Sequence, residues 1–180
     1  INPETSLLAL CIKYPDMLPV IQTSIVDKMF TSKKNAEIYN AFIKLKDDNK
    51  LVDSVTVSEY IKSDKKANAV FGDESVLYSS LSEITATEVK ASSYQDYTDI
   101  IVNNYRKQFA VDETRKSADK MKDGADVTSV VEILGENLRE TERLTSKPYN
   151  SFLDIAQEET NQIEIRAERG PVGLDELFVP

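Results

Sequence analysis

The chain has 180 residues, of which 41% are hydrophobic, and its 22 basic and 31 acidic side chains give a net charge of −9. This length fits one domain, or a domain with an appendage, and allows a substantial core. The acidic balance argues against a surface whose main task is to hold duplex phosphate.

Missing residue types exclude several kinds of site. The sequence has no histidine, which excludes Ser-His and Cys-His nucleophiles, histidine zinc sites and Glu-x-x-His di-iron bundles. It has no Gly-x-x-x-x-Gly-Lys-Ser/Thr or Gly-x-Gly-x-x-Gly phosphate loop either. We therefore expect no catalytic residue, cofactor site or metal site in this chain. Adjacent acids, such as Asp47-Asp48 and Glu158-Glu159, point to different sides of a helix, so solvated faces are the better interpretation.

The cysteine content and the hydropathy indicate a compartment. Cys11 is the one cysteine, so a disulfide framework is excluded, and we expect a small core residue in a reducing environment. No run of about 18 apolar residues occurs, so we expect no membrane partner. These features predict a cytoplasmic protein.

The first helices are marked by their caps. Asn2-Pro3-Glu4 is a helix start that leads to Tyr14-Pro15, and a short helix is expected from Asp16 to Ser24. Ser32 can cap a longer helix over residues 33–48, whose aromatic groups we interpret as core.

The next signals continue the helical pattern. Thr56-Val57-Ser58-Glu59 reads as a capping box that opens a helix at Val57, and residues 63–68 read as a charged connector. Asp73-Glu74 provides the acidic first turn of a further helix. The pattern predicts a globular helical head over residues 1–105.

An antiparallel helical hairpin is predicted over residues 106–145. Helical spacing runs from Ser93 to Asp123, Gly124 stops it, and Asp126 or Thr128 can cap the returning helix. Few large residues and many charges predict that the hairpin projects from the head and pairs with a second copy. The alternative is a solvated pair of helices that folds back on the core. The residues predicted to pair are Val130, Val131, Leu134 and Leu138.

A separate linker helix is predicted within residues 146–169. The Lys147-Pro148 break precedes it, Gly170-Pro171 follows it, and Ser151 can cap it. Its apolar stripe needs a cover, and periodicity leaves open whether the same chain or another protomer provides it. The predicted docking residues are Phe152, Ile155, Ala156, Ile163 and Ala167. The fold class is therefore all-α, with a head, a hairpin and a linker helix.

The order of these parts resembles the amino-terminal region of DnaB-type replicative DNA helicases. The matching segments are Pro3-Glu4-Thr5-Ser6-Leu7-Leu8, Met29-Phe30 with Ile38-Tyr39-x-x-Phe42, Leu45 with Val52-Asp53-x-x-Thr56, Phe71-Gly72-x-x-x-Val76-Leu77-Tyr78-x-x-Leu81, and Tyr97-x-x-Ile100-Ile101-x-x-Asn104-Tyr105-Arg106. Their order and spacing together are more specific than any one of them. Residues 170–180 resemble the family's entry into a RecA-like motor domain. Val172 and Leu174 replace the usual Thr and Phe there, which favours a divergent member, such as one encoded by a phage.

The resemblance implies a mechanical role in a larger protein. It implies self-association into dimers and a hexameric ring, a primase and a helicase loader or inhibitor as partners, and single-stranded DNA passing through the ring. It implies a linker helix docked on a neighbouring motor domain, with ATP and Mg²⁺ bound by the motor and none in this chain. The competing hypothesis is a stand-alone acidic helical adaptor that binds primase, helicase or loader without belonging to a motor.

Overall fold

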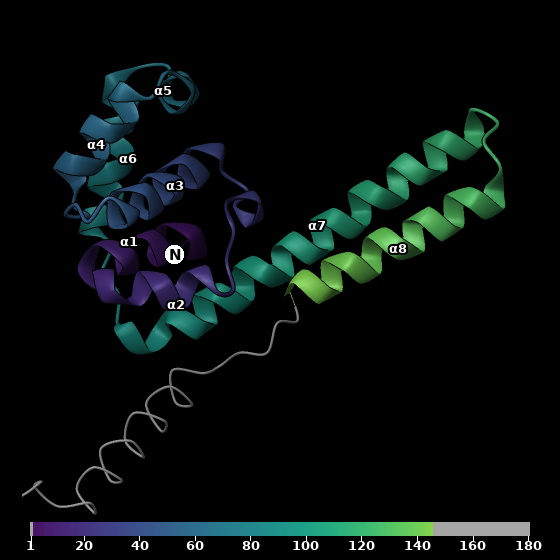
Figure 1. The fold of residues 1–180 in the computed structure, drawn as a ribbon, viewed down its shortest axis with the longest axis horizontal. Helices are drawn as coiled ribbons and strands as arrows, with labels where there is room; N and C mark the ends of the chain where they lie inside the picture. The colour runs from purple at the N-terminus through teal and green to yellow at the C-terminus, as the bar shows by residue number, and fades with distance from the viewer. Residues whose placement is uncertain (1, 146–180) are drawn as a thin grey trace, which may run out of the picture. The chain divides into compact units, whose positions relative to one another are not determined.

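The structure is a computed structural model that describes residues 2–145, and within them every regular element is helical (Figure 1). The chain divides into two units, residues 1–147 and residues 148–180. The elements are α1 (Pro3–Lys13), η1 (Pro15–Met17), α2 (Leu18–Gln22), η2 (Asp27–Met29), α3 (Lys33–Asp47), α4 (Ser54–Ser63), α5 (Lys65–Phe71), α6 (Glu74–Ala86), η3 (Ala91–Ser93), α7 (Tyr94–Lys122) and α8 (Val127–Thr145). The predicted all-α class is confirmed.

Helix α1 is the centre of the core. It packs against α3, α6 and α7, and every side chain from Glu4 to Cys11 is buried. Asn2 caps it as predicted, because the Asn2 side chain accepts the Glu4 N–H at 2.9 Å. Cys11 is buried, which confirms the prediction of a small core residue, and this burial raises the pKa of its thiol to about 12.

The Glu4 carboxylate ties α1 to the start of α3. It is 6% exposed and accepts hydrogen bonds from Thr31 N at 2.6 Å, Ser32 N at 3.3 Å and Asn35 Nδ2 at 2.8 Å. These donors lie at the amino terminus of α3, where backbone N–H groups lack intrahelical partners and favour negative charge. Glu4, the acidic residue of the segment Pro3-Glu4-Thr5-Ser6-Leu7-Leu8, thus has a structural role.

Three predictions for the head are wrong in detail. The capping box starts at Asp53 instead of Thr56, because the Asp53 side chain accepts the Val55 and Thr56 N–H groups at 2.9 and 2.8 Å. The expected connector at 63–68 is mostly helix, because Asp64 caps α5, which buries Ala67 and Phe71. The expected helix from Asp16 to Ser24 is a 3₁₀ turn followed by the shorter α2.

The predicted hairpin is present as α7 and α8, which lie side by side and antiparallel (Figure 1). The first part of α7 buries Tyr94, Thr98 and Ile101, and α7 also packs against α1. Gly124 ends the turn at φ 90°, and Asp126 accepts the Ser129 N–H at 2.9 Å, as a cap does. The predicted boundary between residues 105 and 106 falls inside α7. Within residues 2–145 no helix is both long and apolar enough to cross a bilayer.

Candidate interaction surfaces

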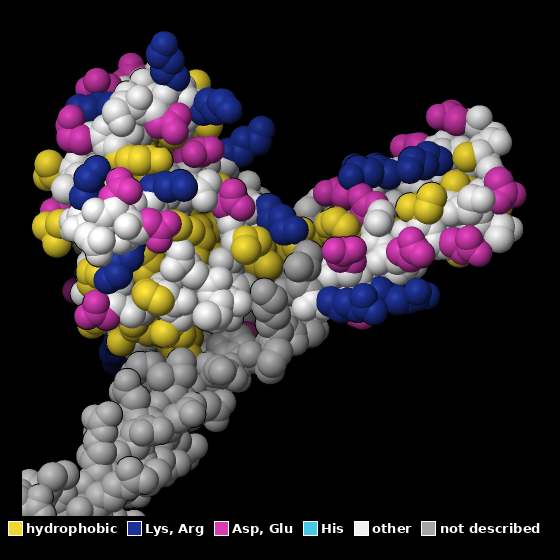
Figure 2. Space-filling view, in the orientation of Figure 1, with side chains coloured by type: hydrophobic (Ala, Val, Ile, Leu, Met, Phe, Trp, Pro, Cys, Tyr) yellow, Lys and Arg dark blue, Asp and Glu magenta, His cyan; other side chains and the backbone are white. Residues whose placement is uncertain are grey.

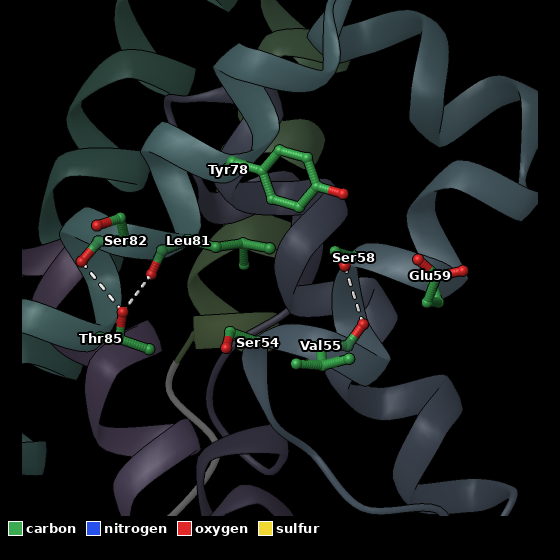
Figure 3. A pocket seen from close by; sticks show the side chains of 8 residues that line it. All are labelled: Ser54, Val55, Ser58, Glu59, Tyr78, Leu81, Ser82 and Thr85. Carbon is green, nitrogen blue, oxygen red and sulfur yellow. Dashed lines mark hydrogen bonds between the residues drawn. The ribbon is translucent and has the colours of Figure 1, made fainter.

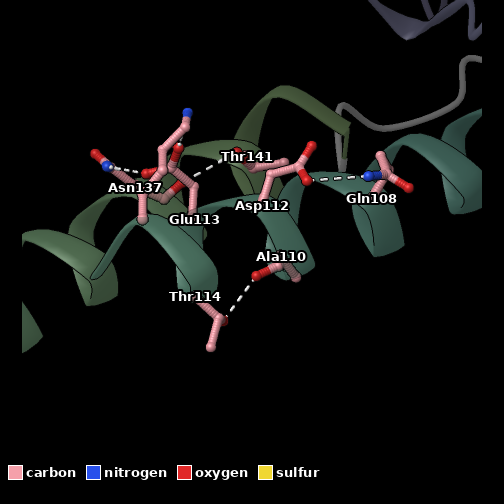
Figure 4. Close-up of polar contacts among 8 residues, drawn as sticks. Gln108, Ala110, Asp112, Glu113, Thr114, Asn137 and Thr141 are labelled. Carbon is pink, nitrogen blue, oxygen red and sulfur yellow. Dashed lines mark hydrogen bonds and ion pairs between the residues drawn. The ribbon is translucent and has the colours of Figure 1, made fainter. Parts of the chain in front are cut away.

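The seam between α7 and α8 is closed by polar groups more than by large apolar ones. Glu113 of α7, whose side chain is 14% exposed, accepts from Asn137 Nδ2 of α8 at 2.9 Å and from Lys116 Nζ at 2.8 Å (Figure 4). Lys116, and after it Asn137, hold the pKa of Glu113 below its ordinary value of 4.5. The buried residues around this contact are Ser117 and Thr141, both polar. This contact joins α7 to α8 through the shielded Glu113 carboxylate.

One edge of α8 carries apolar side chains that α7 does not cover. Val127 and Val131 are 58% and 53% exposed, and Leu134 and Leu138 are half-buried. Steps of four, three and four residues place all four on one side of the helix. We call Val127, Val131, Leu134 and Leu138 the α8 apolar edge. Around it the hairpin surface is strongly charged, with hydrophobic groups between acidic and basic side chains (Figure 2).

The structure therefore divides the residues predicted to pair. Val130, 5% exposed, faces α7 in the seam, whereas Val131, Leu134 and Leu138 belong to the α8 apolar edge. Val127 was missed, although its position four residues before Val131 is the signal that finds it.

A second surface is a groove between α4 and α6, which the sequence did not indicate (Figure 3). Its volume is about 500 Å³. Val55 and Tyr78, which line it, are 68% and 47% exposed. The hydroxyls of Ser58 and Thr85 donate to carbonyls of their own helices, at 2.9 Å to Val55 O and 2.7 Å to Leu81 O. The groove thus presents mostly apolar surface, and the hydroxyl protons of Ser58 and Thr85 are already in use.

A fixed cation stands at the rim of this groove. Lys62 Nζ lies 2.7 Å from the Glu59 carboxylate and 3.2 Å from the Tyr78 hydroxyl, and 5.8 Å from the centroid of the Tyr78 ring. Glu59, and after it Tyr78, raise the pKa of Lys62. Lys62 thus restrains the Tyr78 ring, which is 47% exposed at this groove.

The predicted linker-helix docking residues Phe152, Ile155, Ala156, Ile163 and Ala167 lie outside the described residues, as do the linker and residues 170–180. Among residues 2–145 no group of three or more Cys, Asp or Glu side chains is arranged to hold a metal ion.

Comparisons with known proteins give two positive findings. Residues 1–103 match the DnaB-like helicase N terminal domain family. The fold is similar to the crystal structure of the N-terminal domain of DnaB helicase from Mycobacterium tuberculosis, with a TM-score of 0.62 and 17% sequence identity over 77% of this chain and 95% of that one. No curated protein sequence matches the chain significantly.

Proposed function

The chain belongs to the DnaB-like helicase N-terminal domain family, and we propose that it is the oligomerisation and partner-binding region of a ring-shaped replicative helicase. Family membership supports an oligomerisation region in general and contact with other replication proteins. The proposal adds the surfaces and the stoichiometry: dimers form through the hairpin, three dimers form a hexameric ring, and the ring contacts primase and a loader or inhibitor. ATP and Mg²⁺ would be bound by a motor domain, which would unwind duplex DNA.

The observation that carries this proposal is the α8 apolar edge. Val127 and Val131 are more than half exposed on a helix whose exposed surface also carries the charged residues Glu132, Glu136, Arg139 and Glu140. An uncovered apolar strip on a helical hairpin is completed most simply by the same strip of a second copy, which gives a bundle of four helices.

Analytical ultracentrifugation of the 180-residue chain tests this proposal. Val131→Lys should convert dimers or larger assemblies into monomers, because it places a charge in the centre of the contact. Ile133→Lys is the matched control, because Ile133 is 48% exposed and lies on the opposite edge of α8. A chain that is monomeric at every concentration, or equal loss of assembly in both variants, would contradict the proposal.

The α4–α6 groove is the candidate surface for a second protein. Its exposed Val55, restrained Tyr78 ring and mostly apolar walls fit the apolar face of a partner helix. Val55→Glu should weaken binding of the cognate primase or loader in titration calorimetry. Leu51→Glu is the control, because Leu51 is also 68% exposed but does not line the groove. Equal affinities for the two variants would exclude this surface.

A stand-alone adaptor that binds primase, helicase or loader is the second candidate function. The acidic, wholly helical described part, which carries no metal cluster, is compatible with it. Reading the gene beyond Pro180 separates the two, because a Gly-Lys-Ser/Thr loop downstream supports the helicase and a stop codon supports the adaptor.

A further inference from the structure

Neither the backbone conformation nor the space around Gly135, in the middle of α8, requires glycine within one chain. Gly72 and Gly124 have positive φ, which explains them, but Gly135 is in ordinary helical conformation. A Cβ atom added there would meet only the end of the Arg139 side chain, at 3.7 Å, which is normal van der Waals contact. Glycine inside a helix is less favourable than alanine. A reason for glycine at this position should therefore lie outside the single chain.

Gly135 lies beside the α8 apolar edge. It follows Val131 by four residues and precedes Leu138 by three, so the three share one side of the helix. Gly135 has no side chain between Val131, which is 53% exposed, and the half-buried Leu138, and only the flexible end of Arg139 lies over it, 3.7 Å from the position of a Cβ atom. A position without a side chain lets a second helix approach closely.

We propose that α8 crosses the α8 helix of a second copy at Gly135, in antiparallel orientation. Val131 and Leu138 of each copy then pack around the point of closest approach. The proposal rests on the self-association described above and specifies its contact residue and its orientation.

The charges next to Gly135 select the antiparallel arrangement. Glu132 and Arg139 are exposed, lie two turns apart on the same side of α8, and stand three residues before and four residues after Gly135. In an antiparallel crossing each Glu132 faces the Arg139 of the other copy, and two-fold symmetry forms this pair twice. In a parallel crossing the two-fold axis exchanges the two flanks of the contact, so Glu132 and Arg139 would face the apolar Val131 and Leu138 of the other copy and their charges would be left unpaired.

Gly135→Ala tests the crossing, because it should change two quantities in opposite directions. At concentrations where the chain is monomeric, amide hydrogen exchange in α8 should slow about fourfold, since alanine favours the helix. The dissociation constant for self-association should rise about tenfold or more, since a methyl group on each copy separates the helices. Unchanged or tighter association would overturn the proposal.

A charge exchange tests the orientation. Glu132→Arg and Arg139→Glu should each weaken self-association about tenfold, because each places like charges together twice. The double variant should associate as the unaltered chain does, because the pairs are restored with their signs reversed. Absence of this rescue would overturn the antiparallel crossing.

The outcomes separate this inference from the proposed function. If Val131→Lys abolishes assembly while Gly135→Ala and the charge variants leave it unaffected, the hairpin pairs, but not at Gly135. If the unaltered chain never associates, both proposals fail, and the α8 apolar edge belongs to a contact with a different protein.

Discussion

Removal of the Glu4 carboxylate should destabilise the whole head. Glu4→Ala leaves three donors without their acceptor: Thr31 N, Ser32 N and Asn35 Nδ2. The two short contacts dominate, and a shielded donor without a partner costs about 1 to 3 kcal/mol. Since Thr31 is reached by solvent, we expect a total loss of about 2 to 4 kcal/mol of unfolding free energy. Domains of this size have only about 5 to 15 kcal/mol.

Urea denaturation followed by circular dichroism measures this loss. The transition midpoint of Glu4→Ala should fall while the slope stays constant, because the surface exposed on unfolding does not change. Glu4→Gln should lose less, about 1 to 2 kcal/mol, because its remaining oxygen still accepts one bond. Glu83→Ala, at an exposed position of α6, is the control and should stay within about 0.5 kcal/mol. If Glu4→Ala is as stable as the control, the carboxylate does not anchor α3.

Two further predictions concern caps and turns. The Thr56 N–H, with the Thr56 hydroxyl and the Val55 N–H, holds the pKa of Asp53 below its ordinary value of 3.8. The Asp53 charge therefore stabilises the folded chain fully at pH values above 3.8, and this stabilisation is lost as the pH falls through the lower pKa of the folded state. Asp53→Asn should therefore be about 0.5 kcal/mol less stable than the unaltered chain at about pH 7. The urea midpoints of the two proteins should converge as the pH is lowered to about 3. A difference between the midpoints that widens in acid would show that the Asp53 charge is not the cause. Gly124→Ala should destabilise the hairpin by about 1 kcal/mol, because φ is 90° there. Hydrogen exchange should be faster in α7 and α8 while α1 is unchanged, and unaltered hairpin exchange would show that the turn tolerates a side chain.

Local signals predicted most of the helices correctly. Asn2 and Ser32 cap their helices as expected, and Gly124 ends the long helix where its sequence indicated. Asp73, expected in an acidic first turn, is instead the cap of α6, and Glu74 provides the first-turn acid. A cap acts within four residues of its own position, so its effect is readable without the fold. The error at Thr56 arose because two overlapping sequences can form a capping box. The box that begins at Asp53 is the one that forms, and Val52 and Val57 next to it are buried in the core.

The candidate surfaces were only partly predictable. Helical periodicity placed Val131, Leu134 and Leu138 on one side of α8, but it could not separate the side facing α7 from the edge beside it, so Val130 was grouped with them. The α4–α6 groove had no sequence signal, because its lining comes from two helices brought together by the core. Serines and a valine at helical spacing look like any solvated face.

By itself, the sequence determined the helical class, the hairpin turn and the family, because caps, glycines and short motifs act over a few residues along the chain. Tertiary structure alone decided that Glu4 bonds to residues 31–35, that Lys62 holds Tyr78, and that Val127 and Val131 remain uncovered. Each of these depends on which distant atoms come within about 3 Å, or fail to, and that distance is set by how the helices pack.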